Sequence, residues 1–173
     1  MKNQRKTAGI RDLVRYSLLA SFAALLQVAA TLFPGPGHVL SAFSTLPLAL
    51  ASYIAPGGGA ASLVIAAWLV LVIQPADLIT FLLFTGPLGL VLGWGLHNRA
   101  GTPAVVLAGA ATLTAAMVFM THVLGAPFFR EFLYNKTTVT VIFTYAAFAL
   151  LYSWSWVRFL KKVFGRLDII IHL

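Results

Sequence analysis

Residues 15–38 read RYSLLASFAALLQVAATLFPGPGH, in which one arginine precedes an uncharged apolar run that ends at a cluster of prolines and glycines. The run, residues 16–33, is close to the length that a helix needs to cross a hydrocarbon layer of about 30 Å. A basic segment before an apolar run is also the form of a secretion signal, but this run is long for one and no good cleavage site follows it. We therefore expect a retained first transmembrane helix.

The remainder of the chain is equally apolar. Of its 173 residues, 60% are hydrophobic and 9% are charged, which is far from the composition of a soluble domain. Helix-breaking residues separate six apolar spans: residues 16–33, 39–55, 59–73, 76–96, 103–124 and 138–157. We predict an all-α polytopic membrane protein, a bundle of six transmembrane helices that forms a single transmembrane domain over residues 1–173. The third span is the shortest, which leaves a five-span arrangement open.

The cations lie mostly near the chain ends, and the formal net charge is +8. Lys and Arg concentrate in cytoplasmic segments when loops are short. Six spans place the basic ends, residues 1–15 and 158–173, on the same side as Arg99, whereas five spans would separate the ends. Six spans with both termini cytoplasmic are therefore favoured, in the cell (inner or plasma) membrane. The lipid bilayer then explains the charge better than a nucleic-acid partner does.

The supply of catalytic groups is small. The chain has no cysteine, and its only carboxylates are Asp12, Asp77, Glu131 and Asp168. No two of its four histidines have the spacing of a helical metal site, and no nucleophile, zinc or phosphate-binding motif occurs. We therefore expect a protein that is not an enzyme and has no cofactor or metal site.

Polar residues gather on the side of the membrane that six spans place outside, where they form a candidate pocket for a small solute. These candidate substrate-binding residues are His38, Asp77, His122, Arg130, Glu131, Tyr134 and Asn135. His122 is the most informative, because an ionisable side chain within an apolar span is costly unless it faces a cavity or a partner. Simpler alternatives stay open: loops are polar because they are wet, His122 is a neutral imidazole bonded to a backbone carbonyl, and Asp77 is a helix N-cap.

Small residues mark faces on which another helix could pack closely. Ala20 and Ala24 are four residues apart on the first span, and Gly89 and Gly93 have the same spacing on the fourth. Such a face serves either docking onto another membrane subunit or packing inside the bundle.

Several of these features together resemble the substrate-binding S component of energy-coupling factor (ECF) transporters, which are relatives of ABC importers. The resemblance covers residues 15–99 best, through the Ala20-x-x-x-Ala24 face, the Pro/Gly-rich first loop, Pro47, the sequence APGGGA at residues 55–60, and GPLG at residues 86–89. It implies a subunit that captures a small organic solute, a vitamin or its precursor, from an outward-facing pocket.

The same resemblance implies partners and roles. Ala20 and Ala24 would contact a transmembrane T subunit, and cytoplasmic ATPase subunits would supply the energy. The first outward loop, which ends at His38, would gate the pocket, and the later outward loops would supply most ligand contacts. Two other classes remain: a small structural or assembly membrane protein that acts through helix contacts, and an unassisted channel or secondary transporter, which the lack of a clear inverted repeat disfavours.

Overall fold

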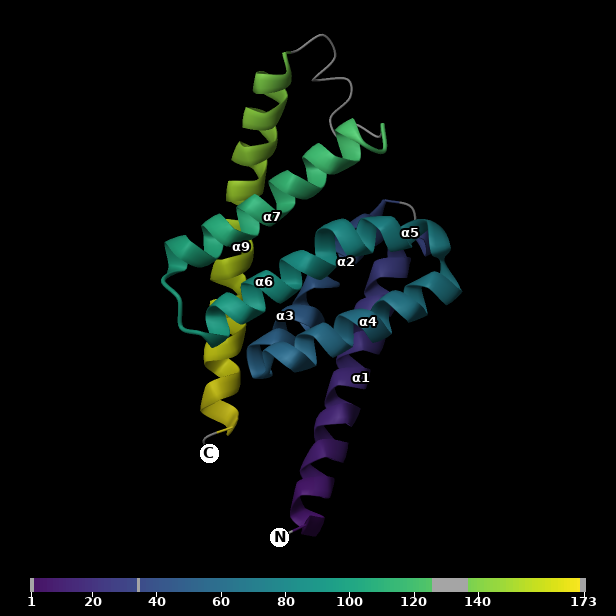
Figure 1. Ribbon diagram of the computed structural model, residues 1–173, viewed down its shortest axis with the longest axis vertical. Helices are drawn as coiled ribbons and strands as arrows, with labels where there is room; N and C mark the ends of the chain where they lie inside the picture. The colour runs from purple at the N-terminus through teal and green to yellow at the C-terminus, as the bar shows by residue number, and fades with distance from the viewer. Residues whose placement is uncertain (1, 34, 126–136, 172–173) are drawn as a thin grey trace. The chain divides into compact units, whose positions relative to one another are not determined.

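In the computed structural model, residues 2–33, 35–125 and 137–171 are described, and almost all of them are helical. They form two compact units, Met1–Ala100 and Gly101–Leu173, which we call unit 1 and unit 2. The helices of unit 1 are α1 (Lys2–Leu32), α2 (Pro36–Ala42), α3 (Thr45–Ile54), α4 (Pro56–Ile73), α5 (Pro75–Thr80), the π-helix η1 (Phe81–Thr85) and α6 (Gly86–His97). Those of unit 2 are α7 (Thr102–His122) and α9 (Thr138–Ile171) (Figure 1).

Six helical segments are long and apolar enough to cross a membrane, which confirms the helical class and the multi-pass character. They are Gly9–Leu32, Pro36–Ile54, Pro56–Ile73, Pro75–His97, Thr102–His122 and Thr138–Arg166. Each corresponds to one predicted span, and the predicted third span is the shortest of the six here too, at 18 residues. The last helix is longer than the predicted span: α9 continues to Ile171, beyond the predicted limit at residue 157.

Prolines set where four of the six candidate spans begin. Pro36, Pro56 and Pro75 are each the first residue of a helix, and Pro103 is the second residue of α7. Proline fits the first turn because its missing N–H group would have no partner there in any case. The connections are consequently short: Ala55 alone separates α3 from α4, and Gln74 alone separates α4 from α5.

Residues 56–58 were expected to break the helix between the predicted second and third spans, but the sequence PGGG at residues 56–59 forms the first turn of α4. A β-carbon on Gly58 would lie 2.2 Å from the Tyr16 ring of α1, and one on Gly59 would lie 2.6 Å from the Ser52 side chain of α3. These two glycines are therefore needed for close helix packing rather than for a turn.

The core of unit 1 is built from α1, α3, α4 and α6, whose closest pairs are α1 with α4 and α3 with α6. In Figure 1, α4 crosses α1. Small residues make the close approach possible: a β-carbon on Gly93 of α6 would lie 2.2 Å from the backbone carbonyl oxygen of Ala49 in α3. Larger apolar side chains fill the remaining space, among them Leu48, Val70 and Phe81.

The fourth span contains a π-helical turn, Phe81–Thr85, between α5 and α6. A π-turn holds one residue more than the α-helical turn that it replaces, and such turns are frequent at functional sites. Phe81 begins the turn and is fully buried, which fixes it in the core of unit 1.

In unit 2, α7 packs against α9. The fully buried Tyr145 of α9 shares a 2.8 Å hydrogen bond between its hydroxyl and that of Thr121 in α7. Near the other end of α7, Lys161 Nζ of α9 donates to Thr102 Oγ1 at 2.5 Å. These two contacts fix the antiparallel pairing of α7 and α9.

Candidate functional site

A buried polar cluster lies inside unit 1, near the C-terminal end of α1. Its centre is Gln27, which is 2% exposed. The side-chain oxygen Gln27 Oε1 accepts hydrogen bonds from the hydroxyls of Ser44 and Thr85, each at 2.9 Å. The cluster therefore ties α1 both to the break between α2 and α3 and to the last residue of η1.

The local backbone places the two donors. Ser44 precedes the first residue of α3 and is fully buried, and Thr85 ends the π-turn. An amide inside hydrocarbon is costly unless its polar atoms are bonded, and two hydroxyl donors satisfy both lone pairs of its oxygen. The break in the second span and the π-turn in the fourth thus supply the two hydroxyl donors that Gln27 Oε1 needs.

Thr45 adds a buried polar atom that no described group bonds. It follows Ser44 in the chain and is fully buried, and its Oγ1 has no hydrogen-bond partner within the described part of the chain. Leaving a buried hydroxyl unsatisfied costs about 1–3 kcal/mol. Such a group in a native structure calls for an explanation, and a ligand atom that bonds it is one.

Asp77 and Thr31 extend the polar residues toward the end of α1. Thr31 Oγ1 donates to Asp77 Oδ2 at 2.8 Å. Thr31 is one turn beyond Gln27 on α1, a rise of about 6 Å. Asp77 is not the N-cap of its helix, as one alternative required, because α5 begins at Pro75 with Gln74 as the capping residue.

Two further predicted site residues, His38 and His122, make hydrogen-bond contacts of their own. His38 lies in α2 and is exposed, and its backbone carbonyl accepts a hydrogen bond from the Ser41 hydroxyl at 3.0 Å. His122 ends α7 in unit 2, is exposed, and has its Nδ1 3.1 Å from the carbonyl oxygen of Val118. This is the backbone contact that the simpler alternative for His122 expected, although at the surface. Arg130, Glu131, Tyr134 and Asn135 lie outside the described residues.

The predicted partner-binding alanines lie inside unit 1. Ala20 is 0% exposed and Ala24 is 1% exposed, and both belong to the core cluster that contains Ala66 and Val70 of α4. The small-residue face of α1 therefore lets α4 approach closely, as the internal-packing alternative stated. A T subunit could reach these two residues only if α4 moved away from α1.

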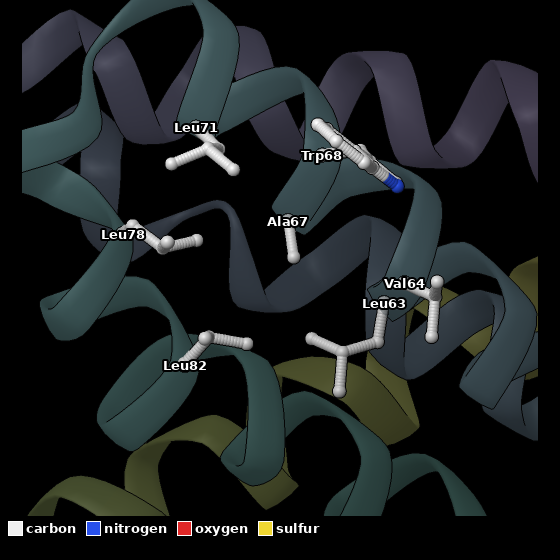
Figure 2. A pocket seen from close by; sticks show the side chains of 7 residues that line it. All are labelled: Leu63, Val64, Ala67, Trp68, Leu71, Leu78 and Leu82. Carbon is white, nitrogen blue, oxygen red and sulfur yellow. The ribbon is translucent and has the colours of Figure 1, made fainter.

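An apolar groove of about 290 Å³ lies between α4 and the α5–η1 segment (Figure 2). Leu63, Ala67 and Leu71 of α4 face Leu78 of α5 and Leu82 of η1, and the exposed Trp68 lies at its side. These side chains are hydrocarbon apart from one indole nitrogen, so the groove offers almost nothing to a polar ligand. In a bilayer it suits a lipid tail, and it is separate from the polar cluster.

The sequence analysis missed Gln27, Ser44, Thr45 and Thr85. The signal that could have found them is Gln27 itself, the one amide within the first apolar span. No group of three or more His, Asp or Glu residues suited to a metal ion occurs among the described residues.

Comparison of the chain with protein-family models, with curated proteins and with solved structures finds no match.

Proposed function

We propose that this chain is a membrane-embedded substrate-capture subunit of the ECF type, which binds a small organic solute from outside the cell membrane. A transmembrane T subunit and cytoplasmic ATPases would then energise its delivery. The observation that carries the proposal is the buried cluster around Gln27, because it concentrates polar atoms inside a largely apolar core.

The depth of the cluster agrees with an outward site. The basic N-terminus marks the cytoplasmic end of α1 under the positive-inside rule, and Gln27 lies near the opposite end, five residues before Leu32. That distance corresponds to about 8 Å along the helix axis. A solute that enters from outside would reach Asp77 and Thr31 first and Gln27 next.

The chemistry of the cluster suggests the kind of solute. An amide and hydroxyl groups recognise uncharged hydrogen-bonding groups, such as those of a heterocycle or an alcohol, and Asp77 offers one carboxylate near the entrance. The buried Thr45 hydroxyl, which no described group bonds, would gain a hydrogen-bond partner from such a ligand. A vitamin or vitamin precursor has this mixture of polar and flat apolar parts.

The alternative of a structural or assembly protein has less support. It relied on the small-residue faces for contact with partner helices, and Ala20, Ala24, Gly89 and Gly93 all pack inside unit 1. The burial of Ala20 and Ala24 counts equally against their docking of a T subunit, so solute capture has priority because of the polar cluster around Gln27 and not because of these faces.

Native mass spectrometry of the purified protein tests the proposal, and we expect one small organic compound to remain bound. Thr45→Val keeps the side-chain shape but removes the unsatisfied hydroxyl, so it should raise the thermal stability of the ligand-free protein and weaken binding of that compound. Thr112→Val is the matched control, because the Thr112 hydroxyl bonds the Ala108 carbonyl of its own helix at 2.9 Å. Unchanged affinity in Thr45→Val, or the absence of any bound compound, would overturn the assignment.

A further inference from the structure

The C-terminal part of α9 carries a basic face. Arg158, Lys161, Lys162 and Arg166 lie within nine residues of one another and are all exposed. At about 100° per residue, the four positions fall within an arc of about 140°. The cations therefore project from one side of the helix rather than around it.

The opposite side of the same segment is packed. Val157, Leu160 and Phe164 are buried, and on the helix they lie roughly opposite the centre of the basic arc. The positive-inside rule requires cations near the end of a span but does not require them on one face. Packing accounts for the rest, because a buried unpaired cation is costly, and it leaves all four cations together on the exposed side.

Two contacts indicate the depth of this face relative to the membrane. The guanidinium carbon of Arg158 lies 3.9 Å from the centre of the Trp154 ring, and tryptophan is enriched where hydrocarbon meets headgroups. Lys161 is bonded to Thr102, the first residue of α7, so it lies level with the start of the preceding span. Both contacts are those expected of a face just beyond the hydrocarbon, at the depth of the lipid phosphates.

The four cations also lack acidic partners among the side chains that the structure describes. The ion pair that it does describe joins Arg15 to Asp12 at 3.7 Å, on α1. Lys161 uses one of its three N–H donors on Thr102 and keeps its charge. The face is therefore positive, exposed and not neutralised by the described side chains.

We propose that the basic face of α9 binds the phosphate headgroups of anionic phospholipids in the cytoplasmic leaflet. Charge complementarity selects this occupant, because that leaflet is negatively charged and cations close to it are attracted to its headgroups. Arg158 and Lys162 are four residues apart and so lie one above the other, which lets both reach one phosphate. Bound anionic lipid would hold the end of the last span at a fixed depth.

The test uses the full-length protein in detergent with equal amounts of phosphatidylglycerol and phosphatidylcholine of matched chain length, and counts bound lipids by native mass spectrometry. Each cation that reaches a headgroup contributes about a fivefold preference, so two should favour phosphatidylglycerol by about twenty-five-fold. R158Q with K162Q should remove most of this preference. R158K with K162R keeps the charges and should retain it.

R11Q with R15Q is the matched control, because it removes two exposed cations from α1 and should leave most of the preference intact. Equal binding of the two lipids by the wild-type protein would overturn the proposal. So would a preference that survives R158Q with K162Q, or one that falls equally in both glutamine variants. Binding of an acidic peptide in place of phosphatidylglycerol would also overturn it, and would assign the basic face to a protein partner.

Discussion

Replacing Gln27 with Met should destabilise the folded protein more than any loss of apolar contact would explain. Methionine has a similar length and apolar character, so the core of unit 1 remains filled. What disappears is the oxygen that accepts from Ser44 and Thr85, and the fully buried Ser44 hydroxyl then has no acceptor.

The magnitude follows from these two bonds. A buried hydroxyl left without a partner costs about 1–3 kcal/mol, and the half-buried Thr85 belongs at the low end of that range. Hydrogen bonds between membrane helices contribute only about 0.6 kcal/mol each on average, so losing both bonds to Gln27 should cost at least about 1 kcal/mol. We expect Gln27→Met to lower the free energy of unfolding by about 2–3 kcal/mol, a factor of about 30 to 150 in the ratio of folded to unfolded protein.

The assay is equilibrium unfolding in mixed detergent and SDS micelles, followed by tryptophan fluorescence. A triple variant, Gln27→Met with Ser44→Ala and Thr85→Val, removes the stranded hydroxyls and should recover most of the loss, because deleting both partners of a buried bond is nearly neutral. Thr112→Val serves as a control and should change stability by less than about 0.5 kcal/mol, since its hydroxyl bonds its own helix. A loss below about 0.5 kcal/mol for Gln27→Met, or a triple variant no more stable than the single one, would refute the assigned role of the cluster.

The same unfolding measurement checks two further expectations. Gly93→Ala should lower the free energy of unfolding by at least about 2 kcal/mol, because the new β-carbon would lie 2.2 Å from a backbone carbonyl oxygen of α3. Gly57→Ala is the control and should be neutral or slightly stabilising, because nothing lies within 4 Å of its new β-carbon. Equal effects of the two substitutions would contradict the packing account. Ala20→Leu and Ala24→Leu should each cost about 1–3 kcal/mol by overfilling the contact between α1 and α4, while the exposed Leu25→Ala should cost much less. If the two alanine variants keep full stability and lose only solute uptake, the face docks a partner instead.

The span pattern could be predicted from the sequence because it depends on composition over long windows. A helix in hydrocarbon must be apolar over its crossing length, so five of the six predicted spans are uncharged runs and the fourth carries only Asp77. Proline and glycine misled us at residues 56–59. In a water-soluble protein they usually mark turns, but in a membrane helix glycine is also the residue that lets backbones approach, and Gly58 and Gly59 do so.

The polar cluster could not be predicted in the same way. Its members come from α1, the α2–α3 break and η1, and they meet only because the helices pack as they do. The prediction favoured charged and ionisable residues of the outward segments, since those carry the strongest chemical signal. Gln27 and Ser44 are neutral and isolated within apolar sequence, and their partnership depends on tertiary contacts that no spacing rule encodes.

The π-turn gives the fourth span one place where its length can change by a single residue. Because the turn holds one residue more than an α-helical turn, deleting one residue from Phe81–Thr85 would restore ordinary α-helical winding and leave α6 on nearly the same face relative to α5. A deletion within α6 has no such reserve: it would rotate the residues on either side of it by about 100° relative to one another, and Gly89 and Gly93 could not both stay against α3. Homologous chains should therefore tolerate a one-residue gap within this turn, or in the connection at residues 98–101, more readily than within α6.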